Sequence, residues 1–222
     1  MPEGATQDAT FLFADIAGFT AVTEVHGDEG AADLVAEFSR QVRGELPSCD
    51  GEHVKTIGDA LLLRIPDPAR AVQLGLCITN DLMRRHGAPA VRVGLHHGPA
   101  VERDGDYFGA TINLAARVSA LAVGGEVLLT ASTAALTREL DGVLFESRGR
   151  EVLRNVREPV EVVAATRRER PLADCLAIDP VCQMAIDPDR AAGRLMLDDT
   201  AYYFCSLACA GAFARHPGRF VD

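Results

Sequence analysis

The sequence lacks the features that would place the protein in a membrane or on nucleic acid. No uninterrupted apolar run is long enough to span a bilayer, and the first ten residues, MPEGATQDAT, have neither a basic start nor an apolar stretch. Basic residues are also scarce: 22 lysines and arginines face 32 acidic residues, for a formal net charge of -10. This balance argues against the basic face that nucleic acid requires. We therefore expect a cytoplasmic protein with no membrane or nucleic-acid partner.

Internal repeats and low-complexity tracts are absent as well, and cysteine is rare in the first three quarters of the chain. Cys49 and Cys77 stand alone, whereas the other four cysteines follow residue 174. Clustered cysteines in a cytosolic chain are more often metal ligands or redox groups than a disulfide framework. The clustering predicts a second domain at residues 175–222, joined by a charged linker at 167–174 to a first domain at 8–166.

Strand and helix signals alternate along the first 166 residues. An amphipathic helix is predicted over 27–46, with Asp28 as its N-cap and a stripe formed by Leu34, Phe38, Val42 and Leu46. Strands are predicted at 10–16, 91–98 and 126–130, with a hairpin at 52–65 and a strand-rich end through VEVVAA, which ends at residue 165. Helices are predicted at 67–87, 107–123 and 131–140. Gly98-Pro99 is expected to end its strand. This order predicts an α+β, ferredoxin-like antiparallel-sheet sandwich with helices on one face, followed by a small cysteine-rich α+β module.

Two aspartates stand where apolar strands end. Asp15 closes the apolar run in FLFADIAGFT, and Asp59 follows Gly58 in the hairpin turn of VKTIGDALLL. Because paired strands lie about 5 Å apart, the two carboxylates can converge on hard divalent cations such as Mg²⁺ or Mn²⁺. Two metals held in this way suit phosphoryl transfer. The alternative is structural: Asp15 caps the following helix and Asp59 makes a turn.

A third motif favours the functional interpretation. DYFGATINLAAR places Asn113 and Arg117 four residues apart on one helix face, where an amide and a guanidinium suit a ribose oxygen and a phosphate. Each residue also has a structural alternative: Asn113 can bond to backbone, Arg117 can pair with a surface acid, and Asp106 can cap the helix. The occurrence of all these residues together, in this order, favours a functional site over the separate structural roles.

Four blocks of the sequence resemble the signature blocks of the class III adenylate and guanylate cyclases. They are FLFADIAGFT, VKTIGDALLL, VRVGLHHGPAV and DYFGATINLAARV, and the resemblance runs over residues 8–166. It implies a cleft between two catalytic domains, in which two Mg²⁺ or Mn²⁺ ions bridge the substrate phosphates. The implied reaction is attack of the ribose 3′ oxygen on the α-phosphate with pyrophosphate leaving.

The resemblance assigns the purine, ribose and α-phosphate to four residues. Lys55 and Asp106 match the positions that contact the purine. Guanylate cyclases usually carry Glu and Cys there, so this pair implies ATP in preference to GTP. Asn113 matches the ribose-orienting asparagine, and Arg117 matches the arginine that stabilises charge developing on the α-phosphate.

The resemblance assigns the metals to Asp15, Ile16 and Asp59. For the terminal phosphates the family usually has a lysine in an LKG-like block, whereas VLRNV offers Arg154 here and replaces the glycine with Asn155. In the family the metal ligands come from one subunit and the purine, ribose and phosphate groups from the other. Since this chain holds both sets, the resemblance implies a homodimer with two composite sites.

The C-terminal segments DPVCQM and YYFCSLACAGAF resemble the YHS domain and the related TRASH-type metal-sensing modules. Cys205 and Cys209 share a helix face, and Cys182 can complete a soft-metal site for Zn²⁺ or Cu⁺, with His216 as a further candidate ligand. The cysteines can alternatively serve as small core residues or form a redox-labile disulfide. Because so small a domain often needs a metal or a crosslink to fold, metal binding is favoured.

Together these features predict an adenylate cyclase that converts ATP to 3′,5′-cyclic AMP and pyrophosphate, with a C-terminal metal- or redox-responsive module that tunes dimer geometry. Two alternatives stay open. A catalytically silent cyclase-like domain would bind nucleotide as a sensor or scaffold, and the altered VLRNV block is compatible with that role. A metal-trafficking protein led by the small domain would bind metal tightly without turnover.

Overall fold

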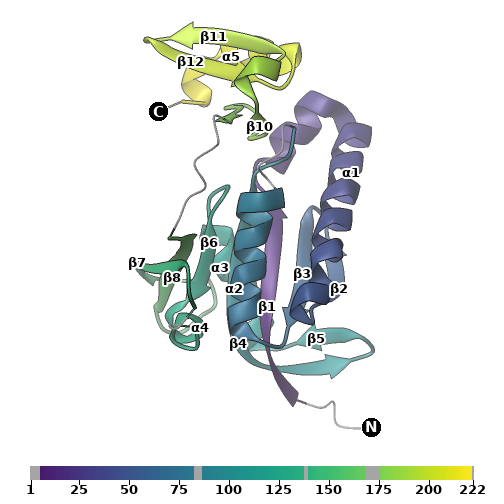
Figure 1. Ribbon diagram of the computed structural model, residues 1–222, viewed down its shortest axis with the longest axis vertical. Coiled ribbons are helices and arrows are strands. Elements are labelled where there is room, and N and C mark those ends of the chain that lie inside the picture. The colour runs from purple at the N-terminus through teal and green to yellow at the C-terminus, as the bar shows by residue number, and fades with distance from the viewer. Residues whose placement is uncertain (1–5, 83–86, 138–139, 169–175, 222) are drawn as a thin grey trace.

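The computed structural model describes residues 6–82, 87–137, 140–168 and 176–221. Its main body is an eight-stranded sheet in the order β2-β3-β1-β4-β6-β8-β7, with β5 paired to β4 (Figure 1). The pairing of β4 with β6 is parallel, and the other described pairings of this sheet are antiparallel. The predicted α+β fold with a mainly antiparallel sheet is confirmed. The strands of the sheet are β1 (Thr6–Ile16), β2 (Glu52–Ile57), β3 (Ala60–Ile65), β4 (Val91–Arg103), β5 (Asp106–Phe108), β6 (Val127–Thr130), β7 (Val143–Glu151) and β8 (Val160–Arg167).

Helices cover both faces of the sheet, not one face as predicted. The helices of the main body are α1 (Phe19–Glu45), α2 (Pro68–Cys77), α3 (Ala110–Leu121) and α4 (Ala131–Ala135), with a π-helical turn at Ile78–Leu82. Leu12 and Ala14 of β1 are buried in the core with α1 and α2, whereas Phe11 and Phe13 are buried in the core with α3. A strand that is apolar on both sides needs cover on both sides. Among the described residues, no helix has the length and apolar character needed to cross a membrane.

Helix α1 begins earlier than predicted and is bent. It starts at Phe19 with Gly18 as N-cap, and Gly27 within it has φ 75° and ψ 170°, which are not helical values. Gly27 therefore divides α1 into two segments. Asp28 lies in the first turn of the second segment instead of at the N-cap position predicted for it. The predicted stripe from Leu34 to Leu46 is confirmed, since it packs in the core against the sheet.

Strand β4 does not end at Gly98-Pro99, as predicted, but continues to Arg103. Pro99 pairs with Asp8 of β1, and its carbonyl oxygen accepts a hydrogen bond from Thr111 Oγ1 (2.6 Å). The carbonyl and the missing N–H of a strand residue lie on the same side, so Pro99 interrupts no bond to β1. A Cβ at Gly98 would lie 3.0 Å from the same Thr111 hydroxyl, which explains the glycine.

The helix predicted at 107–123 begins three residues late, because Asp106–Phe108 form β5. Tyr107 is buried against Phe11, with ring centroids 5.3 Å apart, and this aromatic contact holds β5 on the sheet. Asp106 therefore lies on a strand and is not the helix cap that the structural alternative required.

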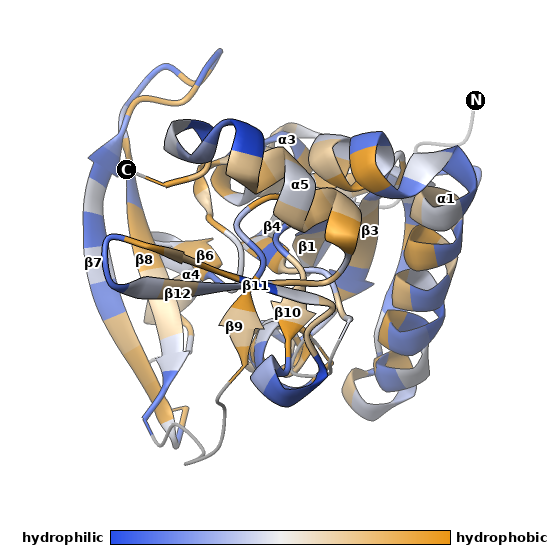
Figure 2. Cartoon of the chain, turned by 90° about the horizontal axis from the view of Figure 1, so that it is seen from above, coloured by the Kyte–Doolittle hydropathy of each residue, from blue (hydrophilic) through white to orange (hydrophobic). Residues whose placement is uncertain are grey.

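Residues 176–221 form a small C-terminal unit over the end of the sheet where β1 ends (Figures 1 and 2). Its elements are β9 (Ala177–Ile178), β10 (Ala185–Ile186), β11 (Gly193–Leu197), β12 (Thr200–Phe204) and α5 (Leu207–Arg215). Phe204 and Phe213 of the unit share one apolar core with Val22 and Ala31 of α1. The unit is thus packed onto the helix that follows β1. Residues 169–175, which hold Cys175 and most of the predicted linker, lie outside the described residues.

Candidate active site

The register between β1 and β3 brings Asp15 and Asp59 together. Asp15 is the last residue but one of β1 and pairs with Ala60, the first residue of β3. Asp59 immediately precedes Ala60, in a turn where Gly58 adopts φ 62°. Strand alternation places Asp15 on the face that α3 covers. We call Asp15 and Asp59 the carboxylate site.

The two carboxyl groups are close enough for one to change the protonation of the other. The pKa of Asp59 is raised to about 6, first by burial and then by the negative charge of Asp15, with which it shares a hydrogen bond. Two carboxylates this close repel each other when both are charged, and nearby positive charge relieves that repulsion. The oxygen atoms of Asp15 and Asp59 therefore fit a hard divalent cation. Ile16 can add only its backbone carbonyl, because its hydrocarbon side chain has no ligand atom.

Arg92 belongs to this site and was missed by the sequence interpretation. It lies directly opposite Asp15 in the β1–β4 register, and Asp15 Oδ2 accepts hydrogen bonds from its Nε (2.7 Å) and Nη2 (2.5 Å). The side chains of Arg92 and Asp15 are 34% and 18% exposed, so water screens the pair only partly. Arg92 could have been identified from its place between two apolar residues of a strand, Val91 and Val93, which are buried. An arginine in such a strand needs an acid opposite it.

Lys55 and Asp106, the residues predicted to contact the purine, form an ion pair within one chain. Lys55 Nζ donates to both carboxylate oxygens of Asp106, at 2.8 and 2.5 Å, and this bonding lowers the pKa of Asp106. The Tyr107 hydroxyl, beside Asp106, donates to Glu52 of β2 (3.3 Å). The β4–β5 hairpin therefore folds toward β2 and brings together two residues that are 51 positions apart.

The other predicted substrate groups do not contact the carboxylate site. Asn113 and Arg117 share the exposed side of α3, whose other side packs on the sheet. Arg154 is exposed between β7 and β8. In the described part of the chain, none of these three makes a hydrogen bond or ion pair with the two aspartates.

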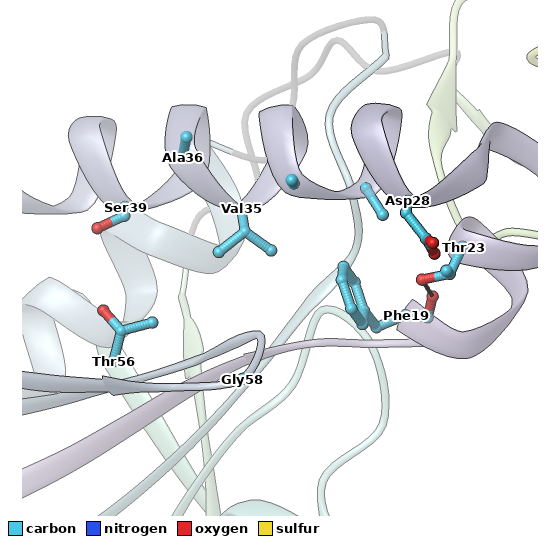
Figure 3. A pocket seen from close by; sticks show the side chains of 10 residues that line it. Phe19, Thr23, Asp28, Val35, Ala36, Ser39, Thr56 and Gly58 are labelled. Carbon is cyan, nitrogen blue, oxygen red and sulfur yellow. Dashed lines mark hydrogen bonds between the residues drawn. The ribbon is translucent and has the colours of Figure 1, made fainter.

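A hollow of about 560 Å³ lies between α1 and the β2–β3 hairpin (Figure 3). It is lined by Phe19, Thr23, Asp28, Ala31, Ala32, Val35, Ala36, Ser39, Thr56 and Gly58. Phe19 rises from the start of α1 into the space above Gly58, the residue before Asp59 (Figure 3). Among the residues that the structure describes, the lining contains an acid and no lysine or arginine, so the hollow does not suit phosphate. Charged phosphates are matched better by cations at the carboxylate site itself.

The three cysteines predicted as metal ligands converge in the C-terminal unit. Cys205 Sγ lies 3.4 Å from Cys182 Sγ and 3.5 Å from Cys209 Sγ. These separations exceed the S–S bond of about 2.05 Å, and all three thiols are free. Cys182 and Cys209 are buried. His216, predicted as a further ligand, is exposed after α5 and lies outside the cluster.

Comparison with known sequences shows one family. A family model of the adenylate and guanylate cyclase catalytic domain matches residues 1–164. A curated relative from Mycobacterium tuberculosis, named as a pH-sensitive adenylate cyclase, is 32% identical over 169 residues, which are 75% of this chain and 42% of the relative. The chain therefore spans less than half the length of that relative.

Solved cyclase structures share the fold at lower identity. The adenylyl cyclase CyaB from P. aeruginosa has a TM-score of 0.67 at 21% identity, covering 77% of this chain and 100% of that chain. The guanylate cyclase domain of RhGC from Catenaria anguillulae, in complex with GTP, has a TM-score of 0.66 at 19% identity, covering 74% and 100%. The fold, the family match and the relative agree, and the chain belongs to the adenylate and guanylate cyclase catalytic-domain family.

Proposed function

We propose that the protein is an adenylate cyclase, which converts ATP to 3′,5′-cyclic AMP and pyrophosphate. The Lys55–Asp106 pair carries this proposal, because a donor and an acceptor stand side by side at the purine-contacting positions of the family. The adenine amino group donates, which suits the Asp106 carboxylate, and the adenine ring nitrogens accept, which suits the Lys55 ammonium. Guanine presents an oxygen acceptor where adenine has its amino group, and an acceptor facing Asp106 is unfavourable.

The carboxylate site and the Ile16 carbonyl would hold two Mg²⁺ or Mn²⁺ ions. When bound, such ions lower the pKa of the ribose 3′ hydroxyl and neutralise charge on the phosphates. Asp15 and Asp59 keep the required negative charge at the end of β1, and Arg92 orients the Asp15 carboxylate through its two hydrogen bonds. The register of the sheet fixes this geometry before nucleotide binds.

The other polar residues would orient the nucleotide without reacting with it. Asn113 would position the ribose, Arg117 would stabilise negative charge developing on the α-phosphate, and Arg154 would bind the terminal phosphates in place of the usual lysine. The 3′ oxygen would give its proton to water and bond to the α-phosphorus, while the bond from that phosphorus to the bridging oxygen breaks and pyrophosphate leaves with the electron pair of that bond. Catalysis then comes from positioning and electrostatics.

Two copies of the chain would complete each site. Asn113 and Arg117 make no hydrogen bond or ion pair with the carboxylate site of their own chain among the described residues, so a second subunit would supply them. Two apolar side chains, Ile57 and Phe108, are 49% and 52% exposed and lie close in sequence to Lys55 and Asp106. Exposed apolar residues beside a site favour a protein interface there. A symmetric dimer of this kind would hold two composite sites.

The C-terminal unit would be a YHS- or TRASH-like domain, over residues 175–222, that binds a soft metal and tunes dimer geometry. The convergence of three free cysteines supports metal binding. Metal titration that changed neither cyclase activity nor dimerisation would contradict the regulatory role.

The test of the main proposal is cyclic nucleotide formation by the purified full chain, given ATP or GTP with Mn²⁺ or Mg²⁺. We expect cyclic AMP from the wild type and none from Asp59→Ala. Asp33→Ala, on the exposed side of α1, is the matched control and should keep full activity. If a folded and dimeric protein made no product from either nucleotide, a silent nucleotide-binding sensor would be the better interpretation.

A double variant tests the choice of base. Lys55→Glu combined with Asp106→Cys introduces the residue pair that guanylate cyclases usually carry. We expect the ratio of kcat/KM for ATP to that for GTP to fall by about a hundredfold, because a site built to hydrogen-bond one base rejects the other. A wild type that prefers GTP would contradict the assignment to ATP.

A further inference from the structure

A histidine of the cyclase domain joins the cysteine cluster. His26, the last residue before the bend in α1, places its Nε2 3.5 Å from Cys205 Sγ. The ligand atoms of His26, Cys182, Cys205 and Cys209 all lie within 4.8 Å of one another. We call these four residues the thiolate site. It lies where α1 packs against the C-terminal unit.

The spacing of these atoms fits a tetrahedral ion. With Zn–S bonds of about 2.3 Å and Zn–N bonds of about 2.0 Å, neighbouring ligand atoms are about 3.5–3.8 Å apart. The contacts of Cys205 Sγ, at 3.4 Å to Cys182, 3.5 Å to Cys209 and 3.5 Å to His26, are close to that spacing. Three thiolates and one imidazole form the Cys₃His set that is typical of structural zinc.

Hydrogen bonds hold the cysteines in place independently of any ion. The buried Asp179 carboxylate accepts from Val181 N (2.9 Å) and Cys205 N (2.8 Å), so it ties the turn before Cys182 to the end of β12. Ser206 Oγ accepts from Cys209 N (3.1 Å) at the start of α5. Groups of this kind, which orient the ligands from outside, are a regular part of metal sites.

The bend in α1 fixes His26 relative to the cysteines. Gly27, with φ 75°, ends the first helical segment directly after His26. Val22 and Val25 of that segment lie in the same apolar core as Phe213 of the C-terminal unit. The segment is therefore anchored on the unit, and the imidazole faces the sulfurs from the side of the cyclase domain.

We propose that the thiolate site binds one Zn²⁺ ion, and that this ion fastens the C-terminal unit to the cyclase domain through His26. The proposal does not depend on cyclase activity. It explains why His26, a residue of α1, lies beside the three cysteines. A metal site that served only the small unit would take all its ligands from that unit.

The contacts of Gln183 connect the thiolate site to the carboxylate site. Gln183 follows Cys182, and a Cβ on Gly18 would lie 3.1 Å from its Cγ. Its carbonyl oxygen accepts from Ala90 N (3.0 Å), two residues before Arg92. Gly18 is three residues after Asp15. An ion held by Cys182 therefore also holds the two segments that carry the Asp15–Arg92 pair.

The first experiment measures Zn²⁺ affinity of the reduced full chain by competition with a chromophoric chelator. We expect one tightly bound zinc per chain in the wild type. His26→Ala should weaken binding by about a hundredfold or more, beyond the usual effect of an outer-sphere change, whereas His216→Ala should stay within about twofold. His26→Cys supplies another ligand at the same place and should restore tight binding.

Two further readouts separate a ligand from a residue that only supports the fold. The Co²⁺-loaded wild type should show the visible bands of a tetrahedral site, and His26→Ala should change their position and intensity, because water replaces the imidazole. Zinc should slow hydrogen exchange in residues 19–26 and 87–90 of the wild type. In His26→Ala it should slow exchange only within residues 176–221.

Three results would overturn the proposal. The first is a His26→Ala variant with wild-type zinc affinity and an unchanged Co²⁺ spectrum. The second is failure of the reduced wild type to retain zinc. The third is a Cys182–Cys205 or Cys205–Cys209 disulfide as the stable form of the purified chain under mild reduction.

Discussion

The described part of the chain holds two sites suited to a cation, and they are built in opposite ways. The carboxylate site is placed by backbone register within an eight-stranded sheet that is covered on both faces. The thiolate site is placed by turns of a small unit and by one residue from a neighbouring helix. The first offers oxygen ligands for a hard cation, and the second offers sulfur and nitrogen for zinc.

Because of this difference, we expect the carboxylate site to affect activity and the thiolate site to affect the stability of the fold. The sheet holds Asp15 and Asp59 in place without help from an ion, so under the proposed function losing a cation there should stop cyclase activity and leave the fold intact. The C-terminal unit is small and shares its core with α1, so losing zinc there should loosen the fold. Four measurements would sharpen or break this contrast.

The largest effect is expected from Asp15→Asn. The change removes a negative charge from the carboxylate site with little change in shape, and cyclase activity should fall by about a thousandfold or more. Zinc content should stay at the wild-type value. Asp33→Asn, on the exposed side of α1, is the control for loss of one acidic residue. Loss of zinc together with activity would show that the two sites are not separable.

Removal of zinc should act on stability. The proposed zinc, at about a thousand times its Kd, would stabilise the folded chain by about 4 kcal/mol, and a strong chelator would remove that contribution. Hydrogen exchange should accelerate most in residues 176–221 and in the first segment of α1, with the central strands changing least. Equal acceleration in β1 and β4 would contradict the contrast.

Arg92→Met should cost less, about 1–3 kcal/mol in the free energy of unfolding. The variant leaves two partly buried carboxyl groups without their positive partner. Arg70→Met is the matched control, because Arg70 pairs with Asp50 at the surface and such pairs contribute less than about 1 kcal/mol. Added Mg²⁺ or Mn²⁺ should reduce the deficit of Arg92→Met, and an unchanged deficit would argue against cation binding.

The smallest effect concerns acid. Burial lowers the pKa of His96 to about 4, so its folded form stays neutral while the unfolded chain takes up a proton near pH 6.5. Its contribution to stability is complete above pH 6.5 and is lost as the pH falls toward 4. Between pH 6.5 and 5.5 the loss is about 1 kcal/mol, and His96→Gln should remove it. Urea unfolding is measured with chelator present, so that the thiolate site does not contribute. An equal loss of unfolding free energy in His96→Gln would contradict the assignment of this loss to His96.

The sequence was a good guide wherever short-range pattern decides the structure. The stripe from Leu34 to Leu46 and the hairpin at Gly58-Asp59 could be predicted, because each is encoded by adjacent residues. Family blocks identified Lys55 and Asp106, and the structure brings these two together. What they bind stays a prediction.

Three of the failures share one physical cause, which is dependence on a partner distant in sequence. Pro99 does not break β4 because its missing donor faces away from β1, toward the side where its carbonyl accepts from Thr111. Arg92 was overlooked because its importance lies in the residue opposite it. His26 could not be identified from spacing, since it lies 179 residues from Cys205.

Helix α1 belongs to two cores, and this has a consequence for how the chain melts. Its first segment gives Val22 and Val25 to the core of the C-terminal unit, and its second gives Phe38 and Val42 to the core of the sheet. A helix shared in this way couples the two parts unequally, so melting of the C-terminal unit should carry the first segment of α1 with it before the sheet unfolds. A chain cut after Arg168 would carry a bare apolar helix face and would aggregate.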